Sequence, residues 1–176
     1  MYRKNRINRV CVQKDMRDQI FDERSFPIRI NLGCGVDKLD GYVNVDGNPE
    51  VDADIHMNLD DRYLVLPWDK EFIHLFYVSH LIEHITYINR FKTEMTRCLE
   101  PGGVIVVIAP NYLSLDAWGD DTHVRGMSIH SFFPDYWPGC NCIRTGIWDM
   151  QDSLGNPIQW VWGVMQKKSP DGTVSI

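Results

Sequence analysis

A turn with two glycines and the aspartate that follows it are the residues whose types and spacing most clearly suggest a ligand site. Gly33 and Gly35 flank Cys34 directly after residues 28–32, where apolar and polar residues alternate, and Asp46 comes eleven residues after Gly35. Glycine lets the backbone of a turn approach a ligand closely, as nucleotide-binding loops require. A carboxylate accepts hydrogen bonds from the two hydroxyls of a ribose. This set of residues therefore suggests a nucleoside site.

The spacing distinguishes a nucleoside from a dinucleotide. A dinucleotide fingerprint has a third glycine where Lys38 stands, a helix whose N-terminus binds the pyrophosphate, and an acid about twenty residues further on. The shorter gap before Asp46 leaves no room for that helix. We therefore favour an adenosine without phosphates, and an NAD-dependent oxidoreductase is the weaker alternative. A simple turn aspartate before residues 47–49 is the other interpretation of Asp46.

A second group of reactive side chains is the series His80, Glu83 and His84. It matches the inverted zinc-peptidase pattern, in which two histidines on one turn of a helix bind zinc and the glutamate is the base. That interpretation needs a further carboxylate ligand on a downstream helix, whereas a buried strand follows here. A zinc hydrolase is therefore kept as an alternative, and we expect no bound metal. For His84, a hydrogen bond at the start of a helix is the simpler interpretation.

The elements that must position these residues follow from the hydrophobic pattern. A helix is predicted over residues 80–99, where apolar side chains recur every three or four residues. A strand buried on both faces is predicted at residues 104–108, so that strand, helix and strand form a βαβ unit with a right-handed crossover. The other predicted strands lie at residues 28–32, 42–45, 51–55 and 73–78, and a C-terminal hairpin joins residues 142–150 and 157–166.

Five sequence blocks follow one another in a characteristic order. They are Asn-Leu-Gly-Cys-Gly at 31–35, Gly-Tyr-Val-Asn-Val-Asp at 41–46, Leu-Pro-Trp at 66–68, Val-Ser-His-Leu-Ile-Glu-His at 78–84 and Leu-Glu-Pro-Gly-Gly-Val at 99–104. In their order and spacing they resemble the class I S-adenosylmethionine-dependent methyltransferases, in particular the methyltransferase type 11-like group, over about residues 28–110. The resemblance implies an α/β, Rossmann-like methyltransferase fold with a mostly parallel seven-stranded sheet and an antiparallel C-terminal hairpin. It also implies S-adenosylmethionine as the cofactor.

The resemblance implies which residues bind the cofactor. The glycine turn would contact its methionine part, Asp46 would hold the ribose, the segment after Asp54 would line the adenine, and the end of the fourth strand would face the methyl group. The residues implied are Gly33, Cys34, Gly35, Asp46, Asn58, Leu59, Ser79 and His80.

Three residues depart from the pattern of the family. Asn31, Asn58 and His74 stand where relatives commonly carry acids. An amide at Asn58 still accepts a hydrogen bond from the adenine amino group. The departures nevertheless motivate an alternative function, that of a binding module which keeps the fold and the cofactor but has no turnover.

The loop at residues 112–127 follows the last parallel strand, at the edge where ligands bind in open α/β sheets. Its Asp-Thr-His-Val-Arg segment resembles a segment of the same family, Asp-Pro-Thr-His-x-Arg, without the proline. The resemblance implies that His123 is a catalytic base and Arg125 a clamp for an anion on the acceptor. His80 is the second candidate catalytic residue and His84 a further substrate contact. A plain surface loop is the alternative.

Length and charge limit the partners. The 176 residues suit one methyltransferase domain at 27–176 after a charged N-terminal arm or helix at 1–26. A net charge of -6 repels a phosphate backbone, and no apolar run is long enough to cross a membrane. We therefore expect a cytoplasmic protein that binds neither nucleic acid nor membrane. With no added domain to recognise a macromolecule, the expected acceptor is a small molecule or a sugar, and the oligomeric state is left open.

Overall fold

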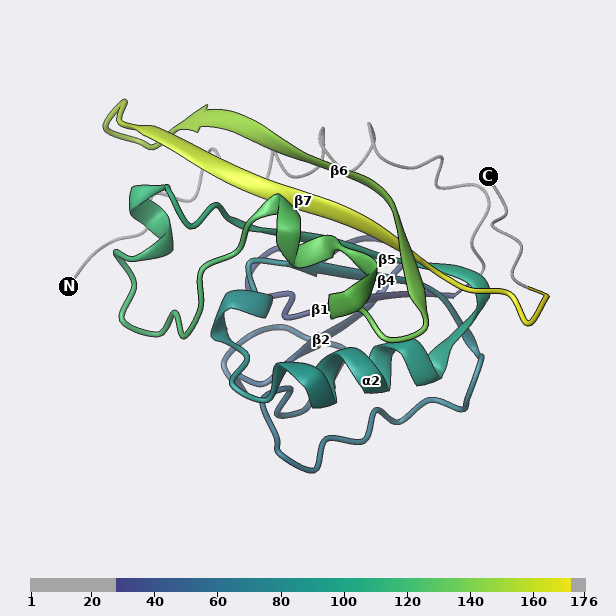
Figure 1. Ribbon diagram of the computed structural model, residues 1–176. Helices are drawn as coiled ribbons and strands as arrows, with labels where there is room; N and C mark the ends of the chain where they lie inside the picture. The colour runs from purple at the N-terminus through teal and green to yellow at the C-terminus, as the bar shows by residue number, and fades with distance from the viewer. Residues whose placement is uncertain (1–27, 172–176) are drawn as a thin grey trace.

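The computed structural model describes residues 28–171, so the expected N-terminal arm at 1–26 lies outside the described residues. Seven strands form one sheet in the order β3-β2-β1-β4-β5-β7-β6 (Figure 1). The strands from β3 to β5 are parallel, whereas β7 is antiparallel to both β5 and β6. The predicted sheet with its antiparallel hairpin is confirmed. The strands are β1 (Arg29–Leu32), β2 (Val43–Asp46), β3 (Ile55–His56), β4 (Ile73–Ser79), β5 (Leu99–Pro110), β6 (Cys140–Gln151) and β7 (Pro157–Lys167).

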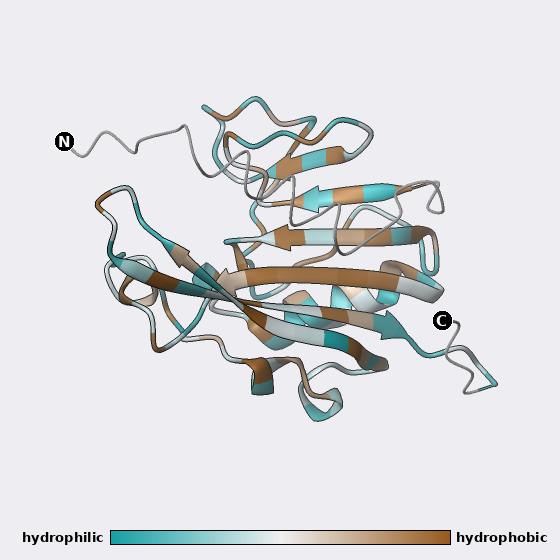
Figure 2. Cartoon of the chain, turned by 90° about the horizontal axis from the view of Figure 1, so that it is seen from above, coloured by the Kyte–Doolittle hydropathy of each residue, from teal (hydrophilic) through white to brown (hydrophobic). Residues whose placement is uncertain are grey.

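The main hydrophobic core lies between the sheet and helix α2 (Ile88–Cys98). Ile30 of β1 pairs with Phe76 of β4, which pairs with Ile105 of β5, and all three side chains are fully buried. Figure 1 shows α2 along one face of the sheet, and Figure 2 shows the most hydrophobic residues on its central strands. This packing fixes the carboxyl ends of β1, β4 and β5 at one edge, where the candidate site residues follow.

The segment after β4 is not the single helix that the periodicity over residues 80–99 predicts. His80 has a φ of +51°, a short 3-10 helix η2 follows at Ile82–His84, and Ile85 is extended. The prediction of one helix from residue 80 is therefore wrong, and helix α2 begins only at residue 88. As a consequence, His80 and His84 do not share the face of one α-helix, which removes the geometric basis of the zinc-peptidase interpretation.

Asp60 explains why the helix begins late. Its Oδ1 accepts hydrogen bonds from the backbone N–H groups of Thr86, at 2.8 Å, and Tyr87, at 3.0 Å. In a continuous helix these N–H groups would bond to carbonyls of the preceding turn. A side chain from a distant loop takes their place, so periodicity within the segment alone could not locate the start of α2.

Strand β3 is shorter than predicted, because it covers Ile55–His56 instead of residues 51–55. Local side-chain bonds hold the preceding segment in turns: Asp46 Oδ1 accepts from the Asn48 N–H at 2.8 Å, and Asn48 Oδ1 accepts from the Glu50 N–H at 3.0 Å. Such bonds offer the backbone an alternative to a strand ladder.

A buried hydrogen-bond network takes the place of a helix between β1 and β2. The Oδ1 of Asn44, a residue only 1% exposed, accepts from the Asn31 amide at 3.0 Å and from the Leu39 N–H at 2.8 Å. The Asn44 amide donates to the Asp54 carboxylate at 3.1 Å, and Lys38 pairs with that carboxylate at 2.8 Å. The hydrogen bond from Lys38, with those from Asn44, lowers the pKa of Asp54 to about 2. Asn31 is thus a structural donor that helps to hold the loop beside the glycine turn.

Three further 3-10 helices lie between β5 and β6: η3 (Leu115–Ala117), η4 (Ile129–Phe132) and η5 (Pro134–Tyr136). Phe132 of η4 is fully buried and lies against the backbone of Gly163 in β7, where a Cβ atom would be only 2.3 Å from the Phe132 ring. This contact packs the connecting segment onto the sheet. Within residues 28–171, no helix is both long enough and apolar enough to span a membrane.

Candidate functional site

The glycine turn and Asp46 lie side by side at the carboxyl ends of β1 and β2. The N–H groups of Gly33 and Cys34 both donate to the carbonyl of Val45, at 2.8 and 3.0 Å. The Gly35 N–H donates to Asp46 Oδ2 at 2.8 Å. A carboxylate oxygen has more than one acceptor site, so Asp46 retains capacity for a ligand while it braces the turn. The structure thus brings together the turn and the acid that the sequence pairs for a nucleoside.

Both glycines of the turn have positive φ angles, +70° at Gly33 and +51° at Gly35. A Cβ atom on Gly33 would lie 2.9 Å from the side chain of Leu81, so glycine allows the segment after β4 to pack on the turn. A Cβ on Gly35 would meet nothing within 4 Å. Open space therefore lies beside Gly35. A cavity of about 280 Å³ is lined there by Gly35, Val36 and Val51.

Cys34, at the centre of the turn, is buried, and this burial together with the nearby Asp46 raises the pKa of its thiol to about 11. The thiol therefore stays protonated at neutral pH and is a poor nucleophile. Its contribution to the turn comes from its backbone, which fits the predicted contact with a cofactor and gives no support to covalent chemistry.

Ser79 ends β4 and His80 follows it, next to the glycine turn, because Val78 of β4 pairs with Leu32 of β1. The His80 N–H donates to the Ile108 carbonyl at 2.9 Å, and its ring contacts Trp160 edge-on, with 4.2 Å between ring centroids. Trp160 donates from Nε1 to Asp116 at 2.9 Å. The His80 backbone is thus bonded to β5, and its ring packs on β7, at the predicted edge of the sheet.

The predicted adenine segment lies next to Asp46, since the Met57 N–H donates to the Asp46 carbonyl at 3.0 Å. The Asn58 side chain is exposed, and its Oδ1 accepts from the Asp60 N–H at 3.0 Å. Leu59 is 5% exposed and packs in the main core. The segment therefore lies beside Asp46 as predicted, but the Leu59 side chain packs in the hydrophobic core.

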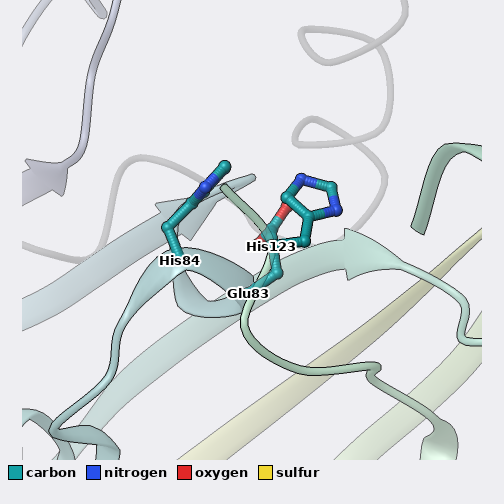
Figure 3. Close-up of side chains that lie close together, drawn as sticks. All are labelled: Glu83, His84 and His123. Carbon is teal, nitrogen blue, oxygen red and sulfur yellow. The ribbon is translucent and has the colours of Figure 1, made fainter. Parts of the chain in front are cut away.

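The structure brings together three side chains that the sequence pattern does not group: Glu83, His84 and His123. One ligand atom from each lies within 4.8 Å of the others, and the two imidazole rings meet edge-on at 4.6 Å between centroids. Figure 3 shows the Glu83 carboxylate extending toward the two rings, which come from η2 and from the loop after β5. The loop is fixed there because the Val124 N–H donates to the Glu83 carbonyl at 2.9 Å.

Arg125 and Lys92 line a different cavity, of about 490 Å³, beside α2. Arg125 donates from one amino group to the carbonyls of Ile85 and Thr86, which ties the loop to the segment before α2. Its Nε is buried without a hydrogen-bond partner. Burial, together with the nearby Arg125, lowers the pKa of Lys92 to about 8. The sequence does not indicate Lys92 as a site residue, because its position in the helical pattern gives no sign of a cavity.

Comparisons with known proteins identify the fold. No protein-family model and no curated protein sequence matches the chain. Many solved structures are similar to it. Three of them are an S-adenosylmethionine-dependent methyltransferase from Mesorhizobium loti (TM-score 0.65, 13% identity, 87% of this chain and 96% of that chain), a putative methyltransferase from Bacillus halodurans C-125 (0.66, 10%, 88% and 98%) and the N-methyltransferase NodS from Bradyrhizobium japonicum WM9 in complex with S-adenosyl-L-homocysteine (0.61, 14%, 82% and 79%).

The chain therefore has the class I methyltransferase fold, as its sequence blocks predict. The antiparallel β7 between β5 and β6, and the glycine turn at the end of β1, are the parts of that fold that frame the site.

Proposed function

We propose that the protein is an S-adenosylmethionine-dependent methyltransferase that acts on a small molecule or a sugar. The observation that carries the proposal is the Asp46 carboxylate, held 2.8 Å from the Gly35 N–H without an intervening helix. This arrangement provides acceptors for a ribose beside an open glycine turn, and it offers no helix N-terminus for a pyrophosphate. The similar structures, which include a complex with S-adenosylhomocysteine, support the same cofactor.

The residues present fit this cofactor. Gly33, Cys34 and Gly35 would present their backbone to its methionine part, Asp46 would accept from the ribose hydroxyls, and the Asn58 amide would lie at the adenine. Ser79 and His80 would border the reacting end. When bound, the cofactor supplies a methyl group on a sulfonium, which an acceptor attacks in line.

The protein must then hold the acceptor atom behind that methyl group and, for a hydroxyl, remove its proton. His123 is a candidate for this base: its Nδ1 lies 2.8 Å from the Ala117 carbonyl, so the proton resides on Nδ1 and Nε2 is left as the acceptor nitrogen. His80 is the second candidate. Arg125 and the neighbouring Lys92 provide cations for an anionic group on the acceptor.

We expect S-adenosylmethionine and S-adenosylhomocysteine to raise the melting temperature of the full-length protein, and NADH to leave it unchanged, because a ligand that binds only the native state stabilises it. At a ligand concentration 100 times its Kd, the stabilisation is about 2.7 kcal/mol. Differential scanning fluorimetry measures the shift. A shift with NADH alone would contradict the cofactor assignment.

Turnover is tested separately by incubating the protein with labelled S-adenosylmethionine and pools of metabolites and sugars. The proposal predicts S-adenosylhomocysteine together with a labelled acceptor from at least one pool. Binding without any product from any pool would instead support the alternative of a binding module without turnover.

A further inference from the structure

Glu83 is a buried carboxylate without hydrogen-bond donors. The residue is 1% exposed, and neither Oε1 nor Oε2 has a hydrogen-bond partner. Moving a carboxylate out of water is strongly unfavourable unless hydrogen bonds or a cation replace the lost hydration. The Glu83 carboxylate also lies near His80, which precedes η2 and whose Nδ1 is 3.5 Å from Oε1. Both carboxylate oxygens can therefore still accept, and a bound cation would replace their lost hydration.

The two histidines beside Glu83 have their other ring nitrogens already oriented. His123 Nδ1 lies 2.8 Å from the Ala117 carbonyl, and His84 Nδ1 lies 3.2 Å from the Thr122 carbonyl and 2.9 Å from the Thr122 hydroxyl. A carbonyl oxygen only accepts, so each Nδ1 carries the proton and each Nε2 has a free lone pair. Metal-binding histidines in proteins are oriented by the same kind of bond from the second ring nitrogen to a carbonyl.

We infer that Glu83, His84 and His123 bind one divalent transition-metal ion, with Zn²⁺ as the best match. Two imidazoles and one carboxylate are a ligand set of zinc sites that keep a further position open, whereas Mg²⁺ prefers six oxygen ligands. The ligand atoms lie within 4.8 Å of one another. Around a tetrahedral zinc they would be roughly 3.3 Å apart, so small side-chain rotations complete the site. The open position accepts an exogenous oxygen ligand such as water.

This assignment differs from two expectations drawn from the sequence. It replaces the expected absence of a metal, and it uses His123 from the distant loop where the zinc-peptidase pattern uses His80. It also makes His123 a metal ligand, which leaves His80 as the base in the proposed methyl transfer. The metal site itself depends only on the cluster and not on the proposed cofactor.

The alternative explanation for Glu83 is an ion pair with His80 alone. That pair would need neither His84 nor His123, whereas a metal site needs both. The decisive variants are therefore His84→Ala and His123→Ala, because both side chains are partly exposed, so that their removal buries no new charge and leaves Glu83 in place. Glu83→Gln is the third variant, which keeps the size of the side chain and removes its charge.

The experiment is a Zn²⁺ titration of full-length protein after chelator treatment, without S-adenosylmethionine, in competition with a chromophoric chelator. We expect one saturable Zn²⁺ per chain in the wild type, with at least about 100-fold weaker binding in His84→Ala and in His123→Ala, since each loses one of three ligands. His56→Ala, which removes an exposed histidine outside the cluster, is the matched control and keeps the wild-type affinity.

Circular dichroism shows whether each variant is folded, and the two histidine variants carry the test if Glu83→Gln does not fold. The inference is overturned if the wild type shows no saturable binding, or if folded His84→Ala and His123→Ala bind zinc as tightly as the wild type. Equal competition by Mg²⁺ would overturn the assignment to a transition metal. If the protein binds S-adenosylhomocysteine but not zinc, this inference alone is refuted. If it binds zinc but not S-adenosylhomocysteine, the proposed cofactor alone is refuted.

Discussion

Asp46→Ala is expected to weaken the binding of S-adenosylhomocysteine at least about 100-fold. A hydrogen bond from a ribose hydroxyl to a carboxylate contributes about 1.5–3 kcal/mol, and the proposal places two of them on Asp46. A loss of about 3 kcal/mol corresponds to roughly a hundredfold change in Kd. Isothermal titration calorimetry of the folded variant, well below its melting temperature, measures the change.

The same variant also loses the acceptors for the Gly35 and Asn48 N–H groups, so its stability must be separated from its affinity. Asp46→Asn keeps the size of the side chain and one acceptor oxygen, and its affinity should fall between wild type and alanine. Asp40→Ala, an exposed acid in the same loop, is the control and should bind as the wild type. Equal affinity in Asp46→Ala and the wild type would refute the ribose assignment.

Asn44→Ala is expected to destabilise the fold by about 3 kcal/mol, because it leaves several buried polar groups without partners. Its side chain bonds to Asn31, Asp54 and the backbone of Leu39, and its amide also donates to the Tyr42 carbonyl at 3.1 Å. Urea unfolding followed by tryptophan fluorescence gives the free energy of unfolding. The loop beside the glycine turn is anchored by the same bonds, so S-adenosylhomocysteine should also bind more weakly.

Asn89→Ala provides the matched control for this stability measurement. Asn89 is exposed on α2, so its removal should change the free energy of unfolding by less than about 0.5 kcal/mol. A loss below about 1 kcal/mol in Asn44→Ala would show that the network is not what holds the loop in place of a helix.

The centre of the sheet could be predicted from the sequence, because β4 and β5 contain long apolar runs whose burial decides their structure. Ile73–Ser79 and Leu99–Pro110 include the runs predicted at residues 73–78 and 104–108. The errors lie where side chains bond to the backbone, from a distant loop before α2 and within the local segment before β3. Asp60 delays the start of α2, and Asp46 with Asn48 holds turns where a longer β3 was predicted.

The candidate cofactor residues could be found because they follow strands whose order is readable from the sequence. The spacing from Gly35 to Asp46 predicted their proximity, which the 2.8 Å hydrogen bond shows. The cluster of Glu83 and His84 with His123 could not be paired in this way, because the loop that carries His123 has no periodic pattern. Its position depends on the Val124 bond to Glu83, a tertiary contact with no local signal.

The most direct test of the proposed function is a crystal structure of the protein in complex with S-adenosylhomocysteine. We predict that the Asp46 carboxylate accepts hydrogen bonds from both ribose hydroxyls and that the methionine part lies against the Gly33–Gly35 turn. A complex in which that carboxylate faces away from the sugar, or in which the ligand lies elsewhere on the sheet, would contradict it.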